Sequence, residues 1–205
     1  YPFEKIQEIL QGKDIVFANL EGPIQKNHIP TPTGSTRFSF KEGSIDLLKK
    51  NYFNVLSIAN NHTLDFGKEV FFTMQKYLTK AGIDAVGHPR EISKEYVVEK
   101  KVKGYAFTFL GFNQVLTPFD EKKALELIKE YEKEGAFTIV SIHWAEEYKL
   151  TSNTWQKNFA HEMINHGADL ILGHHPHVVQ EIEKYKDRLI LYSLGNFIFD
   201  QYFSQ

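Results

Sequence analysis

Three histidines stand within four positions directly after an aliphatic run, in the stretch "ILGHHPHVVQ" at residues 171–180. His175 and His177 have i, i+2 spacing, which in an extended chain points both side chains to the same side. Imidazoles crowded in this way are unfavourable core material unless they have partners. The stretch therefore indicates either a metal site or an ordinary polar loop, and the rest of the sequence has to decide.

Polar clusters follow four predicted core strands: "ANLEG" after 14–18, "ANNH" after 53–59, "HWAEEY" after 137–142 and "GHHPH" after 169–172. In α/β proteins, ligands bind at the edge where the carboxyl ends of the parallel strands meet. We therefore expect one group of side chains to converge at this edge: Glu21, Asn61, His62, His143, His175 and His177.

Each of these residues also has an ordinary structural explanation when it is taken alone. The Asn61-His62 pair is typical of a turn or a helix cap, and His143 after "IVSI" is compatible with a core histidine that has its hydrogen bonds satisfied. Glu21 after an apolar strand is compatible with a solvated capping residue. The functional interpretation depends on their shared position at strand ends.

The predicted elements that would position these residues alternate between helices and strands. Helical patterns cover 3–10, 44–51, 66–81, 121–135 and 154–167, and strand patterns cover 14–20, 53–59, 83–87, 137–142, 168–173, 178–185 and 188–194. Residues 95–112 form a predicted hairpin that turns at Lys103-Gly104, and residues 25–40 a predicted loop. This order predicts an α/β fold: a layered α/β sandwich with mixed sheets flanked by helices.

Composition sets the class of protein but not its function. The chain has 205 residues, 42% hydrophobic and 24% charged, which fits one globular domain over residues 1–205. The formal net charge of −2 gives no reason to expect a nucleic acid or a membrane surface as partner. There is no cysteine, which excludes disulfides, thiolate metal sites and a cysteine nucleophile.

The chain opens at Tyr1, and we expect native sequence upstream of it, in which a signal peptide or membrane anchor has room to lie. No apolar run within the chain approaches the roughly 20 residues that a membrane-spanning helix needs.

Neutral imidazoles, a carboxylate and an amide oxygen together suit first-row divalent ions such as Mn, Fe, Zn or Ni. A carboxylate can bridge two such ions about 3.5–4 Å apart, and such a pair activates water for attack on a phosphoryl group. A histidine beside the ions can protonate the leaving oxygen. Asp65, three residues after His62, is placed to orient the ring of that histidine.

Five segments, "NLEGPI", "ANNHTLDFG", "HWAEEY", "GHHPHVVQ" and "YSLGNFIFD", resemble the ordered motifs of the bacterial CapA family. This family of capsule and poly-gamma-glutamate synthesis proteins belongs to the calcineurin-like metallophosphoesterase superfamily. The resemblance runs from the first helix to the last residues and implies a metallophosphoesterase-type sandwich. It also implies roles in metal binding and catalysis for particular residues.

The roles that the resemblance implies fall on the converging residues. Glu21 matches a bridging carboxylate, and His62 matches the proton-donating histidine, with Asp65 as its catalytic partner. The implied metal ligands are Glu21, Asn61, His143, His175 and His177. His174 stands where the superfamily has the glycine of a Gly-His-x-His motif, so His174 stays open as an alternative to His175. Arg37 and Glu147 match segments that would contact an anionic substrate or line its pocket.

The family opens with a strand that ends in Gly-Asp, and this strand is missing from the sequence. The resemblance therefore implies an N-terminally incomplete domain. One divalent ion, Mn, Fe or Zn, would be bound well by Glu21, Asn61, His143 and His175, and the second site, with Glu21 and His177, would be incomplete.

Two functions stay open. The first is a divalent-metal-dependent hydrolase acting on a phosphoester or a related bond. The second is a non-catalytic accessory protein that binds an anionic polymer during its assembly or export. The resemblance implies a location at the cell surface, and a nucleic-acid-processing role is disfavoured by the near-neutral charge. The sequence leaves the substrate, the metal and the oligomeric state open.

Overall fold

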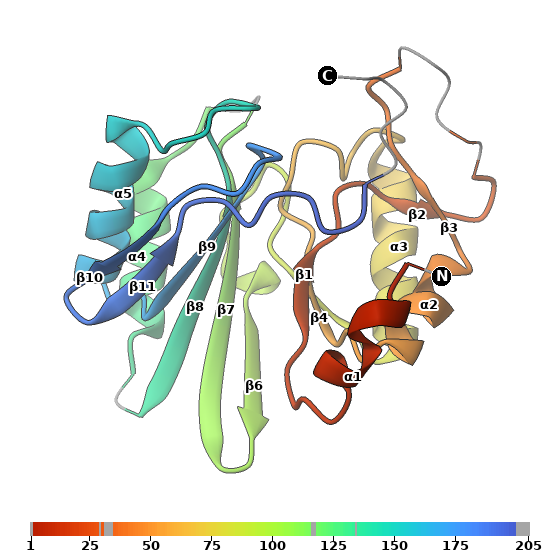
Figure 1. The fold of residues 1–205 in the computed structure, drawn as a ribbon, viewed down its shortest axis with the longest axis horizontal. Helices are drawn as coiled ribbons and strands as arrows, with labels where there is room; N and C mark the ends of the chain where they lie inside the picture. The colour runs from red at the N-terminus through yellow and green to blue at the C-terminus, as the bar shows by residue number, and fades with distance from the viewer. Residues whose placement is uncertain (1, 29, 31–34, 116–117, 134, 200–205) are drawn as a thin grey trace.

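The computed structural model describes residues 2–28, 30, 35–115, 118–133 and 135–199. Within these ranges the chain forms a sheet of three strands, a sheet of six strands and a small pair of strands. Helices α1–α3 lie on the outer side of the three-stranded sheet, and helices α4 and α5 lie on the outer side of the six-stranded sheet (Figure 1). The predicted layered α/β sandwich with mixed sheets and flanking helices is therefore confirmed.

The first half of the molecule contains the three-stranded sheet, with strand order β1-β4-β5 and parallel pairing throughout. Its strands are β1 (Phe17–Asn19), β4 (Val55–Ser57) and β5 (Asp84–Val86), and its helices are α1 (Gln7–Leu10, preceded by a 3-10 turn at Glu4–Ile6), α2 (Ser44–Lys50) and α3 (Lys68–Ala81). The pair formed by β2 (Ile24–Gln25) and β3 (Phe40–Lys41) lies beside α3. Helix α3 buries Phe71, Met74 and Leu78, which recur at helical spacing, against the sheet.

The second half contains the six-stranded sheet, with strand order β10-β11-β9-β8-β7-β6. Its elements are β6 (Val98–Val102), β7 (Tyr105–Asn113), α4 (Glu121–Tyr131), β8 (Ala136–His143), α5 (Thr154–Asn165), β9 (Leu170–His174), β10 (Ile182–Tyr185) and β11 (Arg188–Leu191), with a 3-10 turn at Lys94–Tyr96 before β6. The central strands pair in parallel, whereas the edge pairs β6–β7 and β10–β11 are antiparallel. A capping box between Asn153 and Gln156 fixes the start of α5.

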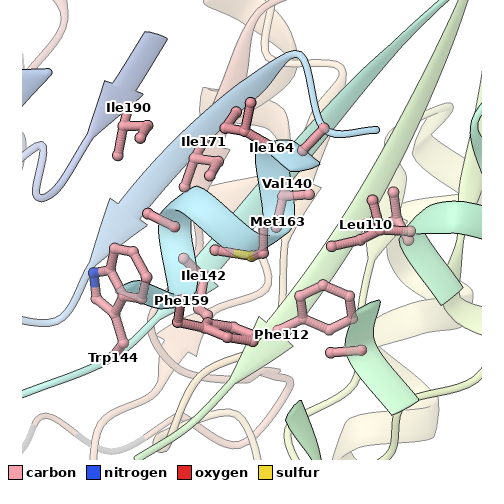
Figure 2. Close-up of a cluster of buried hydrophobic side chains, with 14 of the residues drawn as sticks. Leu110, Phe112, Val140, Ile142, Trp144, Phe159, Met163, Ile164, Ile171 and Ile190 are labelled. Atoms are coloured by element: carbon pink, nitrogen blue, oxygen red, sulfur yellow. The ribbon is translucent and has the colours of Figure 1, made fainter. Parts of the chain in front are cut away.

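The described residues form three hydrophobic cores that hold four layers together. The largest lies between the six-stranded sheet and helices α4 and α5, where Ile142, Trp144 and Met163 are fully buried (Figure 2). A second core packs α1–α3 on the three-stranded sheet, and a smaller one lies between the two sheets around Val55 and Phe109. The sandwich therefore places both sheets at its centre, with their carboxyl ends along one side.

Two glycines bring the sheets close together near that side. A Cβ atom on Gly111, in β7, would lie 2.9 Å from the carbonyl oxygen of Val86, the last residue of β5, and 2.9 Å from the Cα of Gly87, the next residue. Such distances are shorter than real Cβ contacts allow, so Gly111 permits an approach of the two halves that a larger residue would prevent.

Most predicted elements are present, with shorter ends. The hairpin turns at Lys103-Gly104 as predicted, and both residues have positive φ. The predicted loop at 25–40 is bounded by the short strands β2 and β3, and its residues 29 and 31–34 lie outside the described part. The predicted strand 178–185 is a strand over Ile182–Tyr185 only, with one isolated bridge between Val179 and Leu194 before it.

Helices long and apolar enough to cross a bilayer are absent from the described ranges.

Candidate metal centre

The candidate site lies where strands of both sheets end. Glu21 stands two residues after β1, and Asn61 and His62 follow β4 in the same sheet. His143 is the last residue of β8, where it pairs in register with His174 of the neighbouring strand β9. The segments that were predicted to deliver polar side chains to one edge therefore do so from two sheets, not one.

The first group of converging atoms comprises one carboxylate and two imidazoles. Ligand atoms of Glu21, His143 and His175 all lie within 4.8 Å of one another. The Nε2 atom of His143 is 3.7 Å from Oε1 of Glu21, and the His143 and His175 rings have centroids 4.8 Å apart. These distances place three donor groups of two types, carboxylate and imidazole, around one point, and first-row metal ions accept both types.

A second group adjoins the first. Ligand atoms of Glu147, His175 and His177 also lie within 4.8 Å of one another, and Nε2 of His177 is 3.5 Å from Oε1 of Glu21. One carboxylate oxygen of Glu21 thus lies near imidazoles of both groups. Glu147 is exposed in the loop after β8, and it adds a carboxylate to the group that contains His177. The sequence suggested Glu147 only as a residue that lines the pocket.

Several buried atoms of the predicted ligand residues have no hydrogen-bond partner in the described part of the chain. They are Oε1 of Glu21, Oδ1 of Asn61, both ring nitrogens of His143 and Nδ1 of His175. Leaving a buried polar atom unpaired costs about 1–3 kcal/mol, so such atoms are rare and call for an explanation. The two oxygens have lone pairs to donate, and each neutral imidazole has one on its unprotonated nitrogen, so a divalent cation would satisfy the oxygens and one nitrogen of each ring.

Burial keeps the imidazoles neutral. It lowers the pKa of His175 to about 4, with the charges of His177 and His62 adding to the effect. Burial also lowers the pKa of His143 well below its usual value, reinforced by His175. Burial raises the pKa of the Glu21 carboxyl, and His177 and His62 oppose that rise. Neutral imidazoles are the form that binds metal ions, because their unprotonated nitrogen carries the lone pair.

His174 and His175 point to different environments. His175 belongs to both groups described above, whereas the His174 ring lies 6.2 Å from that of Phe17, a residue packed in the core between the sheets. Burial lowers the pKa of His174 to about 4, and its Nε2 has no partner among the residues that the structure covers. The geometry therefore brings His175, and not His174, to the candidate site.

The argument from an extended chain at residues 175–177 is wrong in its premise. Strand β9 ends at His174, and His175 and His177 have φ values of 97° and 58°. Their side chains nevertheless face one place, with ring centroids 5.7 Å apart. Non-glycine residues at positive φ are uncommon and cost of order 1–3 kcal/mol each, and they gather at functional sites.

His62 and Asp65 form the pair that their spacing predicts. Nδ1 of His62 lies 2.9 Å from Oδ2 of Asp65, and the same oxygen accepts a hydrogen bond from the backbone N–H of Phe38 at 2.8 Å. Because a carboxylate accepts, Nδ1 of His62 is the donor, which leaves Nε2 as the ring nitrogen available for proton transfer. The edge of the Phe38 ring packs against His62, with centroids 4.3 Å apart.

Arg37 lies behind this pair. Its guanidinium donates to the backbone carbonyl of Asp65 and stacks over Phe66 at 4.5 Å from the ring centroid. The Arg37 side chain is exposed and lies next to the His62–Asp65 segment. Its sequence motif did not predict this position.

A network of asparagines around the first half of the site was not singled out from the sequence. The buried amide of Asn60 donates to Asn19 at 3.1 Å and to the carbonyl of Leu20 at 2.8 Å, and it accepts from Thr63 at 2.8 Å. Asn19 in turn donates to Oε2 of Glu21 at 3.2 Å. The double asparagine in "ANNH" was the one sequence feature that could have indicated this network. The amide of Asn60 is fully buried and orders the turn that presents Asn61.

The four-layer α/β architecture is consistent with the predicted metallophosphoesterase-type sandwich, and it carries a candidate divalent-metal centre at its strand ends. The family-wide pattern described as "Bacterial capsule synthesis protein PGA_cap" matches residues 1–201. The chain therefore belongs to the bacterial capsule synthesis protein family PGA_cap, as the resemblance to CapA proteins predicted.

Individual proteins agree with this assignment. The chain is 34% identical to the PGA biosynthesis protein CapA of Bacillus subtilis over 97% of its length, and 32% identical to the capsule biosynthesis protein CapA of Bacillus anthracis over 98%. It spans 57% and 54% of these relatives, respectively. A crystal structure of a hypothetical protein from Thermus thermophilus has a similar fold, with a TM-score of 0.64 and 19% identity, covering 93% of this chain and 68% of that one.

Proposed function

We propose that the protein is a divalent-metal-dependent hydrolase of a phosphoester or a related bond. The observation that carries this proposal is the set of buried nitrogen and oxygen atoms on Glu21, Asn61, His143 and His175 for which the described chain provides no hydrogen-bond partner. Mn, Fe or Zn would fit this donor set of imidazole, carboxylate and amide oxygen. Glu21, Asn61, His143 and His175 would hold one ion, and His177, Glu147 and the shared oxygen of Glu21 would hold a second one more weakly.

When bound, the metal would supply an activated water and neutralise charge on the phosphoryl group. The chain's own residues then have two tasks. His143 and His175 bind through neutral imidazoles that burial keeps unprotonated. His62, held at Nδ1 by Asp65, would enter this step as the imidazolium, give the proton on Nε2 to the leaving oxygen and be left as the neutral ring, a role for which the fixed ring orientation is required.

The substrate would be an anionic polymer or a precursor of one. Arg37 stands beside the His62–Asp65 pair with an exposed guanidinium, and this charge would attract an acidic group. The two Bacillus relatives are named for the biosynthesis of capsule and of poly-gamma-glutamate, and we propose that this protein acts in the same process. The activity would then be a processing step in polymer assembly at the cell surface.

A second function is favoured by those names, since they describe biosynthesis and not hydrolysis. In this alternative the metal centre binds an acidic polymer through the cation, and no bond is broken. The two functions differ in what His62 does, because a binding protein has no use for a proton donor.

The test is hydrolysis of bis(p-nitrophenyl) phosphate with added Mn²⁺, combined with Mn²⁺ binding measured by calorimetry. His62→Ala is expected to lower kcat about 10²–10⁴-fold and to retain Mn²⁺ binding. His143→Ala is expected to lose both. His161→Ala is the matched control, because His161 lies on α5 and contacts Glu183 at 2.8 Å.

Turnover that is unchanged in His62→Ala would contradict the proposed mechanism. Tight binding of Mn²⁺ without turnover of this or other phosphoesters would favour the accessory function, and wild-type protein that binds no divalent ion would contradict both.

A further inference from the structure

The segment after β11 contributes a residue to the candidate metal centre. Oδ1 of Asn196 lies 2.8 Å from Nδ1 of His177. An amide oxygen can only accept a hydrogen bond, so Nδ1 of His177 carries the proton. In a neutral imidazole the other nitrogen, Nε2, is then unprotonated, and this is the atom that lies 3.5 Å from Oε1 of Glu21.

Asn196 is itself held in place from both sides along the chain. Before it, the backbone N–H of Leu194 donates to the carbonyl of Gly173 at 3.1 Å, and Leu194 bridges to Val179. Gly195 has φ of 67°, and a Cβ atom there would lie 3.0 Å from the backbone nitrogen of Val179. The turn therefore needs glycine for its conformation and for its close packing.

After Asn196, aromatic side chains attach the segment to the first half. Phe197 lies 6.2 Å from Phe3 and Phe199 lies 6.3 Å from Phe38, measured between ring centroids. The segment crosses from the six-stranded sheet to the first half of the molecule (Figure 1). Phe199 also lies 5.5 Å from His177, so this crossing segment covers the outer side of that imidazole.

We propose that Asn196 is a positioning residue for His177. By accepting from Nδ1, it fixes the tautomer in which the Nε2 lone pair is directed to Glu21 and the second group of ligand atoms. Hydrogen bonds of this kind to metal-binding histidines orient the ring and strengthen the ligand, and their removal costs 10–100-fold in metal affinity. The role toward a metal ion rests on the proposed function, whereas the role in fixing the tautomer does not.

The first experiment measures the tautomer without metal. In protein treated with a chelator at about pH 8.5, where imidazoles are neutral, two-bond ¹H–¹⁵N spectra distinguish the ring nitrogens of His177. The wild type is expected to show protonation at Nδ1. Asn196→Ala is expected to populate the Nε2–H form, and Asn196→Asp, which keeps an acceptor oxygen, is expected to retain the wild-type spectrum.

The second experiment measures Mn²⁺ affinity by calorimetry in the same variants. Asn196→Ala is expected to weaken the weaker site at least about 10-fold, and Asn196→Asp to stay near the wild type. Asn165→Ala is the control, because Asn165 at the end of α5 also accepts a side-chain hydrogen bond, from Lys186, and stands outside the site.

An Nδ1–H tautomer that persists in Asn196→Ala would overturn the proposal, and so would equal losses of Mn²⁺ affinity in the Ala and Asp variants. Wild-type protein that binds no Mn²⁺ would instead contradict the proposed hydrolase, and the ring spectra would still decide what Asn196 does.

Discussion

The two halves of the molecule prepare their parts of the site in different ways. In the first half, the turn after β4 is held by the chain itself: Asn60 hydrogen-bonds with Asn19, Leu20 and Thr63, and Asp65 orients His62. In the second half, both ring nitrogens of His143 are buried without a hydrogen-bond partner among the described residues, and the backbone at His175 has positive φ.

The difference shows where an added ligand would contribute stability. In the first half, hydrogen bonds within the chain already order Asn60, Thr63 and the His62–Asp65 pair, whereas its candidate ligand atoms, Oε1 of Glu21 and Oδ1 of Asn61, have no hydrogen-bond partner among the described residues. The second half keeps neutral imidazoles buried at a cost, because their lone pairs are directed to a place that the described side chains leave unsatisfied. Such an arrangement favours binding over stability, as strained functional sites commonly do.

The largest expected effect is a difference between one substitution in each half in how much it changes the free energy of unfolding without metal. Asn60→Ala should lower the free energy of unfolding by about 3 kcal/mol, because several buried hydrogen bonds of about 1 kcal/mol each are lost. His143→Leu should leave it unchanged within about 1 kcal/mol or raise it, because an unpaired buried imidazole is replaced by an apolar group. Urea denaturation with a chelator present measures both, and equal losses would remove the distinction between the halves.

Adding metal should make His143 important for stability, although its replacement by leucine is expected to cost little in the chelated protein. At a Mn²⁺ concentration of 100 times Kd, binding stabilises the folded state by about 2.7 kcal/mol. For a chain of this size, that corresponds to a rise in Tm of about 5–11 °C. The rise should vanish in His143→Leu, and differential scanning calorimetry with and without Mn²⁺ measures it. An equal rise in the variant would show that Mn²⁺ binds elsewhere.

The contact between the halves can be changed at a single glycine. Gly111→Ala should destabilise the protein by about 1–3 kcal/mol, because its Cβ would meet the backbone around Gly87. It should also weaken Mn²⁺ binding, since ligands come from both sheets. Gly43→Ala is the control, because no atom lies within 4 Å of a Cβ there and its φ is −62°. Unaltered Mn²⁺ affinity in Gly111→Ala would mean that the site tolerates displacement of the sheets.

The smallest expected effect concerns His88, a buried histidine of the first half whose Nδ1 accepts from the backbone N–H groups of Arg90 and Glu91. Burial lowers its pKa, with Glu91 opposing and Lys68 and Arg90 adding to the shift. The unfolded chain therefore takes up a proton first as pH falls below about 6.5, and the free energy of unfolding decreases. His88→Asn should make this decrease less steep in urea titrations between pH 7 and 5, and an unchanged slope would contradict it.

The sequence predicted the order and types of the elements because their periodicities are strong. Helix α3 has Phe71, Met74 and Leu78 at helical spacing and ends at Ala81, where it is capped by Gly82 in the left-handed conformation. The strands β8 and β9 are apolar runs that both end in histidine. Such local patterns carry enough information to place polar clusters at strand ends.

The details of the site depend on geometry that local patterns do not contain. Which of His174 and His175 lies in the clusters of candidate ligands depends on where β9 ends and on a backbone turn with positive φ, which no residue preference at these positions indicates. The partnership of Asn196 with His177 depends on a segment that returns to the site after two further strands. Non-local pairings of this kind follow from the tertiary fold.

The candidate ligands are divided between two sheets whose shared core is small compared with the cores under the helices. A cation shared by Glu21 and His143 would therefore act as a cross-link between segments that are distant in the sequence, and would oppose any motion that separates the sheets. Strands β4 and β7 contribute Val55 and Phe109 to that shared core. Their backbone amide hydrogens would then exchange more slowly in the metal-bound protein than in the metal-free one.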